Sequence, residues 1–260
     1  MSPRASTSVS LDWNGSVAVV RLEGPHSKNA LDLDCLHEFG EAISATSGAR
    51  AVVLAAEGDS FSAGRDLKDD RMFGDPEALL MELFNPLIAR IAGLRCPTFA
   101  AVQGAALGAG FGLAFACDIV VASDDALIGS PFAKLGGVPD CGFHLFVSAR
   151  IGTRRTLELI YSGRLLSGSE AAEIGLVNRC VPRADLMTVT MDMAEAAARG
   201  PTAAFALSKS IIRKLEDQQV SLADVLRDEA VWASAALKTE DAKEGLAAFL
   251  ERRAPVFQGR

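Results

Sequence analysis

Residues Ala101–Val120 read AVQGAALGAGFGLAFACDIV, and this stretch decides the fold class. The apolar run Thr98–Val102 predicts a strand, and the small residues of Gly108–Ala116 predict a short helix. A strand that leads through a glycine-rich turn into a helix is typical of an α/β fold with parallel strands. The first amides of such a helix have no partner within the helix, so they can bind a ligand oxygen.

A second glycine-rich turn, GDSFSAGRDL (Gly58–Leu67), follows the predicted buried strand Ala51–Ala56. Two such turns side by side can direct two backbone N–H donors at one oxygen atom, as in an oxyanion hole. Small residues suit this arrangement because the backbone itself must approach the ligand. The residues of Ala101–Val120 that meet this demand are Gly104, Gly108, Ala109, Gly110 and Gly112. Close packing of a helix on a sheet is the alternative explanation for these glycines.

A single carboxylate follows these two turns. The segment KLGGVPDCG (Lys134–Gly142) contains Asp140 as its only acid. A carboxylate beside an oxyanion hole can move a proton, and an apolar pocket would raise its pKa and so improve it as a base. An aspartate after a proline is also a common turn residue, so motif context has to decide between the two interpretations.

The order of predicted elements indicates a core with a largely parallel sheet. Residues 1–10 are polar and predict a frayed tail. A strand over Ser16–Gly24, a helix over Leu31–Thr46 and the strand Ala51–Ala56 predict one crossover unit, with Asp32 or Asp34 as the helix cap. Further helices are predicted over 79–94, 142–149 and 153–162, with a capped one from Ser167.

The character of the chain changes at Ala184, where glycine becomes rare and apolar residues follow a helical period. We therefore expect a core domain over 1–183 and a helical subdomain over 184–260. Helices of this second part are predicted over 194–199, 203–215, 222–237 and 242–253.

Composition excludes several classes of function. The 260 residues are 49% hydrophobic and 23% charged, as in a globular protein with a sizeable core, and carry a net charge of −7, which disfavours nucleic acid as a partner. No apolar run reaches the roughly 18 residues of a membrane span, and no signal peptide is recognisable, so we expect a cytoplasmic protein that does not bind membranes. Five cysteines without a CxxC pair and three scattered histidines predict neither disulfides nor a metal site.

Jointly, several motifs resemble the crotonase (enoyl-CoA hydratase/isomerase) superfamily over nearly the whole chain. They are KNAL (Lys28–Leu31), FSAGRDL (Phe61–Leu67), GAALGAG (Gly104–Gly110), CDI (Cys117–Ile119) and EGLAAFLERRAPVF (Glu244–Phe257). The resemblance implies an α/β fold, a crotonase-like spiral of ββα units with a helical C-terminal oligomerisation subdomain. It also implies an acyl-CoA thioester substrate, no cofactor beyond the coenzyme A of that substrate, and a homotrimer or a hexamer of two trimers.

The resemblance also implies roles for individual residues. The backbone N–H groups of Arg65 and Ala109 are expected to form the oxyanion hole, while the Arg65 side chain faces either solvent or a phosphate. The residues expected to line the substrate and its coenzyme A are Lys28, Ala63, Arg65, Asp66, Leu67, Lys68, Ala109 and Phe132.

Departures from the family pattern bear on the reaction. The two glutamates with which hydratases of the family activate water fall on Gly112 and Phe132, whereas Asp140 stands where several isomerases carry their single catalytic acid. The segments FNPL (Phe84–Leu87) and FAKLGGVPDCG (Phe132–Gly142) most resemble the isomerases of bacterial phenylacetate breakdown.

The sequence thus predicts an enoyl-CoA isomerase that converts 3-enoyl to 2-enoyl thioesters, with Asp140 as the acid. One alternative is a hydratase or another acyl-CoA lyase that uses Asp140 alone or with His144, although His144 also fits an ordinary helix-face or core position. An alternative of another class is a non-catalytic oligomer that binds acyl-CoA.

Overall fold

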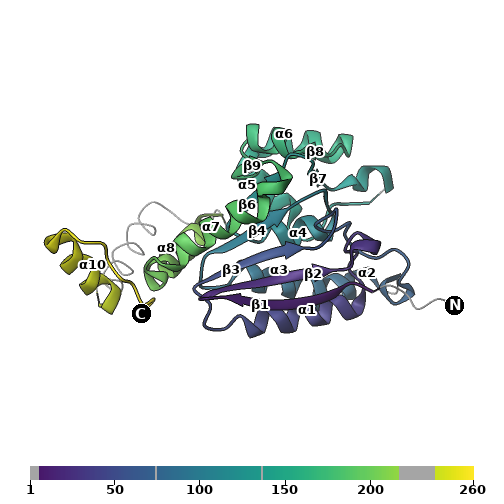
Figure 1. The fold of residues 1–260 in the computed structure, drawn as a ribbon. Coiled ribbons are helices and arrows are strands. Elements are labelled where there is room, and N and C mark those ends of the chain that lie inside the picture. The colour runs from purple at the N-terminus through teal and green to yellow at the C-terminus, as the bar shows by residue number, and fades with distance from the viewer. Residues whose placement is uncertain (1–5, 74, 136, 217–237) are drawn as a thin grey trace.

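A six-stranded sheet forms the centre of the molecule in the computed structural model, which describes residues 6–73, 75–135, 137–216 and 238–260 (Figure 1). The strands lie in the order β1-β2-β3-β4-β6-β9. β1 and β2 are antiparallel, and every later neighbour in the sheet pairs in parallel. The strands are β1 (Ser8–Asn14), β2 (Val17–Glu23), β3 (Ala51–Ala56), β4 (Thr98–Val102), β6 (Ile119–Ser123) and β9 (Arg179–Val181). The predicted parallel α/β core is confirmed.

The sheet is buried on both faces because its strands alternate apolar side chains between two separate clusters. Val20 and Leu54 point to one cluster, which packs against α1 (Leu33–Ala45), α3 (Asn85–Ala92) and α4 (Ala109–Phe115). Val19 and Val53 point to the other, which α7 (Leu186–Ala198) covers. Parallel strands covered on both sides are continuously apolar, as β3 is.

The first crossover unit agrees with its prediction, and Asp32 is the helix cap: its side chain accepts a hydrogen bond from the Cys35 amide at 2.8 Å. The predicted frayed tail over 1–10 is wrong from Ser8 onward, where β1 begins. In β1 only alternate residues face the core, Val9 and Leu11 being partly buried, and the polar residues between them conceal the strand in the sequence.

A smaller three-stranded sheet lies beside the glycine-rich helix. It consists of β5 (Ala105–Leu107), β7 (Leu127–Gly129) and β8 (Leu166–Ser167), in that order. α5 (Phe143–Ser162) joins the two helices predicted there, and Gly152 between them has non-helical angles (φ 75°, ψ 166°). α6 (Gly168–Glu173) begins with the predicted cap, a capping box between Ser167 and Glu170.

Short helical segments complete the core. They are the 3₁₀ segments 25–27, 70–73, 131–135 and 183–185, the helix α2 (Pro76–Leu79) and the π-helix Leu80–Phe84, which runs directly into α3. The predicted helix over 79–94 is therefore continuous to Ala92, with one π-helical turn inside it.

The C-terminal part is helical as predicted, with α8 (Thr202–Glu216) and α10 (Glu240–Glu251), and in Figure 1 α10 lies apart from the sheet. The Arg50 guanidinium links this part to the core, because it donates to the carbonyls of Gly200 at 2.6 Å and Phe257 at 2.7 Å. The helix predicted over 222–237 lies outside the described residues. α7, which follows the predicted boundary at 184, packs on the sheet.

Candidate active site

A cavity of about 190 Å³ lies where the two glycine-rich elements meet the segment that carries Asp140. Its walls are mainly apolar. They consist of Ala63, Gly64, Arg65, Leu67, Leu79, Leu80, Phe84, Leu107, Gly108, Ala109, Pro131, Phe132, Asp140 and Cys141. An apolar pocket with few polar groups is the usual form of a small-molecule site.

The first glycine-rich element lies between two neighbouring segments of backbone. On one side, Leu31 donates to the Gly64 carbonyl at 2.8 Å and accepts from the Asp66 amide at 2.9 Å. On the other side, Ser62 donates to the Ala105 carbonyl at 2.8 Å. Because backbone groups alternate in direction along an extended segment, the Arg65 N–H points away from Leu31, and Arg65 is part of the cavity wall.

Gly64 brings the two predicted oxyanion donors close together. A Cβ atom on Gly64 would lie 2.6 Å from the Leu107 carbonyl oxygen and 3.5 Å from the Ala109 amide nitrogen. Only glycine allows this approach, and its φ of +88° also disfavours other residues. The amide of Arg65 follows Gly64, and the amide of Ala109 begins α4, so both donors belong to adjacent parts of one wall.

Three of the glycines in Ala101–Val120 serve chain packing, which is the alternative explanation given above, and do not approach a ligand. A Cβ on Gly104 would overlap the Asp59 carbonyl oxygen, and one on Gly110 would lie 2.6 Å from the Ser62 carbonyl oxygen. Gly112 meets Cys141 in the same way. The two glycine-rich elements are thus in van der Waals contact, because the glycines have no side chains to separate them. Of the five small residues, only Gly108 and Ala109 are on the cavity wall.

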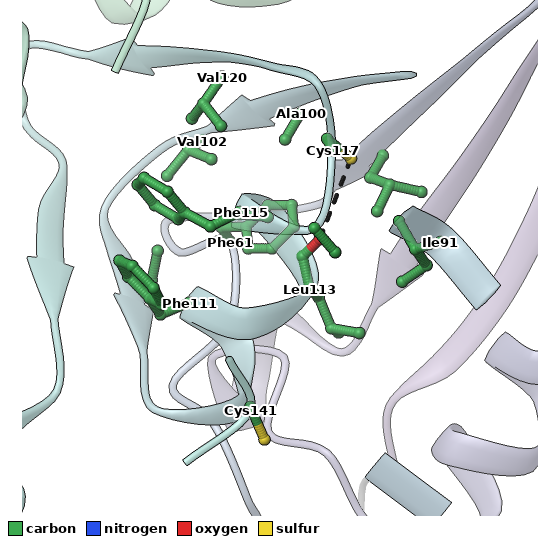
Figure 2. Packing of buried hydrophobic residues seen from close by; sticks show 14 of the residues in the cluster. Phe61, Ile91, Ala100, Val102, Phe111, Leu113, Phe115, Cys117, Val120 and Cys141 are labelled. Atoms are coloured by element: carbon green, nitrogen blue, oxygen red, sulfur yellow. Dashed lines mark hydrogen bonds between the residues drawn. The ribbon is translucent and has the colours of Figure 1, made fainter. Parts of the chain in front are cut away.

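The helix that carries Ala109 is held rigidly by its aromatic side chains. Figure 2 shows Phe111, Leu113 and Phe115 in the core around α4, with Cys141 on a separate segment. The Phe111 and Phe115 rings stack at 3.9 Å, and the Phe143 ring lies 4.9 Å from that of Phe111. Such packing fixes the start of α4, and with it the Ala109 amide.

Asp140 is the only carboxylate among the described residues of the cavity wall. Its Oδ1 atom is buried and has no hydrogen-bond partner in the described part of the chain. Burial raises the pKa of Asp140, while the neighbouring Cys141 thiol and the Arg65 charge act in the opposite direction. A buried carboxylate with an unused oxygen and a raised pKa is suited to proton transfer.

Phe132 and Gly112 are the two positions on which the family resemblance places the glutamates of the hydratases. The Phe132 ring is part of the cavity wall, and a Cβ on Gly108 would lie 3.6 Å from its edge. Gly112 is buried within α4 behind that wall. Neither residue can hold or activate water.

The structure brings together six of the predicted site residues, which are Ala63, Arg65, Leu67, Ala109, Phe132 and Asp140. Lys28, Asp66 and Lys68 are not on the cavity wall. Lys28 is adjacent through its backbone, since its carbonyl accepts from the Ala63 amide at 2.9 Å, but its side chain and that of Lys68 are exposed.

His144 takes no part in the cavity. It is exposed on α5, where its ring centre lies 6.3 Å from that of Phe143. A helix-face position, weighed above against a second pocket group, is therefore confirmed.

Sequence reasoning missed the helical wall of the cavity and the residues that hold the first turn. Leu79 and Leu80 line the cavity with Phe84, and a π-helical turn runs over Leu80–Phe84; such turns are frequent at functional sites. The FNPL segment begins at Phe84, and the residues before it contain no motif that predicts a cavity wall.

Asn29 and Ser62 hold the first glycine-rich turn from behind. Asn29 is fully buried and accepts from the Gly24 amide at 2.7 Å, while its side-chain amide donates to the Ser60 carbonyl at 2.7 Å. The Ser62 hydroxyl donates to the Asn29 carbonyl at 2.7 Å and accepts from the Gly64 amide at 3.1 Å. The KNAL motif contains Asn29, and it was the only signal for this network.

Comparison with known proteins shows the family to which the chain belongs. The family model described as enoyl-CoA hydratase/isomerase matches residues 12–260. A Mycobacterium tuberculosis protein named as an enoyl-CoA hydratase, echA8, is 34% identical, with 94% of this chain and 95% of that protein covered. YhaR of Bacillus subtilis, named as an enoyl-CoA hydratase/isomerase, is 35% identical, with 94% and 96% covered.

Solved structures give the same result. An enoyl-CoA hydratase subunit from Geobacillus kaustophilus superposes with a TM-score of 0.90 at 35% identity, covering 99% of this chain and 100% of that one. The enoyl-CoA hydratase of Bacillus anthracis gives a TM-score of 0.90 at 32% identity, with 97% and 99% covered. The fold is the crotonase fold. The chain belongs to the enoyl-CoA hydratase/isomerase family.

Two further observations concern the part of the chain that the structure describes. No helix there is both long and apolar enough to span a membrane. No group of three or more histidine, cysteine, aspartate or glutamate side chains gathers there in a way that could hold a metal ion.

Proposed function

We propose that the protein is an enoyl-CoA isomerase that moves the double bond of a 3-enoyl-CoA thioester to the 2-position. The observation that carries this proposal is Asp140, a lone carboxylate in a cavity that also contains both predicted oxyanion donors. Among the described residues, the cavity wall holds no second acid that could position a water molecule opposite it.

In the proposed reaction, the Asp140 carboxylate removes a proton from C2, and the thioester oxygen takes up the negative charge of the resulting dienolate. The amides of Arg65 and Ala109 hydrogen-bond to this oxygen, whose charge develops only during the reaction. The protonated Asp140 then returns the proton to C4, and the double bond forms between C2 and C3. One proton moves and no electrons are gained or lost, so we propose no cofactor beyond the coenzyme A of the substrate.

Burial of Asp140 suits both halves of this reaction. A carboxylate with an ordinary pKa is too weak a base to remove a carbon-bound proton efficiently, and burial raises the pKa of Asp140. The apolar wall formed by Leu79, Leu80 and Phe132 also limits water at the dienolate, which favours proton return over side reactions.

A second candidate is an enoyl-CoA hydratase, and the names of the relatives favour it. The proteins from Mycobacterium tuberculosis and Geobacillus kaustophilus are both named as hydratases. In this chain, hydration would have to use Asp140 alone, because Gly112 and Phe132 stand at the positions of the two family glutamates. The third candidate is a non-catalytic protein that binds acyl-CoA.

One isotope experiment separates the three candidates. Protein is incubated with a 3-enoyl-CoA in deuterated water, and deuterium at C2 and C4 is followed by NMR together with migration of the double bond. We expect exchange and migration in the wild type and a loss of at least about 1,000-fold in Asp140→Asn, since the only acid is removed. Asp12→Asn, an exposed acid on β1, is the matched control and should keep full activity.

Each other outcome assigns a different function. A 3-hydroxyacyl-CoA product from a 2-enoyl-CoA, formed faster than the double bond migrates, would favour the hydratase. Binding of the thioester without exchange would favour the non-catalytic protein. Cyclic and linear 3-enoyl-CoA substrates in the same assay test the predicted relation to the isomerases of phenylacetate breakdown.

We further propose that the protein assembles as a homotrimer or as a hexamer of two trimers. Large apolar side chains are exposed on the helical C-terminal part, including Ile212 on α8 at 57% and Leu246 on α10 at 63%. Exposed apolar surface of this kind is typical of an interface between subunits. Light scattering coupled to size-exclusion chromatography gives the assembly mass, and a monomer at micromolar concentration would contradict the proposal.

A further inference from the structure

The segment that carries Asp140 is a tight turn with an unusual backbone. The Phe143 amide donates to the Asp140 carbonyl at 3.1 Å, and the two residues between them have positive φ, +53° for Cys141 and +82° for Gly142. Positive φ at both central residues is the mark of a type I′ turn, which glycine, asparagine and aspartate favour. Cysteine at the first central position is therefore held there by its surroundings.

Those surroundings include a close contact with α4. Cys141 is 3% exposed, and a Cβ on Gly112 would lie 2.5 Å from the Cys141 Cβ and 2.6 Å from the Cys141 carbonyl oxygen. One of these two atoms is backbone, so no change of side-chain rotamer would relieve the overlap. The Cys141 turn thus fills the space that any side chain at position 112 would need.

Gly142, the second central residue of the turn, also has no space for a side chain. A Cβ on Gly142 would lie 2.5 Å from the Phe146 ring, and the Phe146 amide donates to the Gly142 carbonyl at 2.9 Å. The turn therefore contacts α4 through Cys141 and leads directly into α5 through Gly142. Asp140 is its first residue, so the place of the turn determines where the carboxylate enters the cavity.

We propose that Gly112 is a positioning residue for Asp140: its missing side chain admits the Cys141 turn against α4 and so sets the carboxylate at the cavity wall. This inference rests on the proposed isomerase function. It also means that a side chain at position 112 requires the backbone of the Cys141 turn to shift.

Gly112→Ala tests the inference, with Gly40→Ala as matched control. Both glycines lie inside helices, but a Cβ on Gly40 would meet only the flexible Arg90 guanidinium, at 3.5 Å. We expect Gly112→Ala to lower kcat about 100-fold with KM within threefold, because small displacements of a catalytic group cost about that much. Gly40→Ala should keep kcat within twofold, and thermal melting of both variants reports on folding.

Rescue distinguishes positioning from general damage to α4. Cys141→Gly removes the Cys141 Cβ, one of the two atoms that a Cβ at position 112 would meet. Glycine also lets the turn rotate its carbonyl, the other atom, away from position 112 at low cost, because it tolerates a wide range of backbone angles. We therefore expect kcat of Gly112→Ala/Cys141→Gly to recover at least tenfold over Gly112→Ala. The acid limb of the kcat/KM profile should also shift in Gly112→Ala, since the Arg65 charge and the Cys141 thiol act on the pKa of Asp140 in its present place.

Cys141→Val gives a test from the side of the turn that does not depend on the folding of Gly112→Ala. A larger β-branched side chain against Gly112, at positive φ, should displace the turn and lower kcat similarly. Wild-type kcat in Gly112→Ala or in Cys141→Val would overturn the inference, as would a loss that Cys141→Gly does not relieve. Absence of isomerisation in the wild type would instead overturn the proposed function.

Discussion

The hydroxyl of Ser62 accepts a hydrogen bond from the amide of Gly64 at 3.1 Å and donates one to the carbonyl of Asn29 at 2.7 Å. Ser62 is completely buried, so neither bond competes with water. The bond to Gly64 fixes the Ala63–Gly64 peptide, one residue before Arg65, whose amide is one predicted oxyanion donor. A single buried hydroxyl thus orients the first glycine-rich turn.

Ser62→Ala should therefore impair catalysis more than binding. The Gly64 amide and Asn29 carbonyl lose their partner, the turn becomes less well oriented, and kcat is expected to fall about tenfold with little change in KM; removal of an oxyanion donor itself costs about 100-fold or more. Steady-state kinetics measure both constants. Ser44→Ala, which removes an exposed hydroxyl bonded to the Gly40 carbonyl, is the control. An unchanged kcat in Ser62→Ala would show that the turn needs no such support.

The pH dependence of activity should reflect the burial of Asp140. The carboxylate acts as a base only when ionised, and burial raises its pKa above the ordinary value of 3.8. The kcat/KM for isomerisation should accordingly fall on the acid side of the profile, at a pH above that of an ordinary aspartate. An acid limb at or below the ordinary aspartate pKa would contradict this expectation.

Replacement of Arg65 should move that acid limb in a defined direction. The Arg65 charge lowers the pKa of Asp140 by favouring the ionised form. Arg65→Met keeps the backbone amide and removes the charge, so the limb should shift to higher pH. Initial rates measured across the acid range for both proteins give the shift. An acid limb at the same pH in both proteins would mean that the guanidinium does not act on Asp140.

Asp140→Asn should stabilise the fold while it abolishes activity. The folded-state pKa of Asp140 is raised, so the folded protein binds more protons than the unfolded chain between the two pKa values, and stability falls as pH rises through that window. Above it the buried charge is a net cost, which asparagine removes. We expect a gain of roughly 0.5–2 kcal/mol at neutral pH. Thermal melting at neutral pH and near pH 4 measures the gain, which should shrink at the lower pH.

Asp118 should contribute strongly to the attachment of α8. Its carboxylate accepts from the Lys209 ammonium at 2.8 Å, the Arg213 guanidinium at 3.2 Å and the Thr98 amide at 2.9 Å. Asp118→Asn leaves two partly buried cations without their anion, and we expect a loss of about 2 kcal/mol in the free energy of unfolding, below the range for fully buried pairs.

Urea unfolding measures that loss, and an exposed ion pair gives the control. Glu240 bonds Lys243 at 2.8 Å, but both side chains are 65% exposed, so Glu240→Gln should leave the unfolding midpoint unchanged. Equal midpoints for Asp118→Asn and wild type would show that Asp118 does not hold α8 on the core.

The parts of the fold that rest on local chemistry were predictable from the sequence. The apolar β3, the Asp32 cap and the break at Gly152 each follow from a few neighbouring residues. The three strands of the smaller sheet were missed, since strands of two or three residues carry no readable period. β1 was missed for a related reason, because polar residues alternate with the few that it buries.

Only those residues of the candidate site that belong to recognisable sequence motifs were predictable. The two glycine-rich turns and Asp140 were found together on one cavity wall, whereas Leu79 and Leu80 were not anticipated, because their role depends on where a helix lies in space. The sequence also could not separate glycines that approach a ligand from those that approach another segment of chain. Both situations require the same missing Cβ, and only coordinates show that Gly104 and Gly110 belong to the second.

The contact between Gly112 and Cys141 has a consequence for how such enzymes diverge. A lineage that exchanged one-acid for two-acid chemistry could not begin with a side chain at position 112, because the turn behind Asp140 already occupies that volume. A change at position 112 of this chain would have to be accompanied by a change in the backbone of the turn. Positions 112 and 141 should therefore be epistatic, which means that the effect of a substitution at one of them depends on the residue at the other.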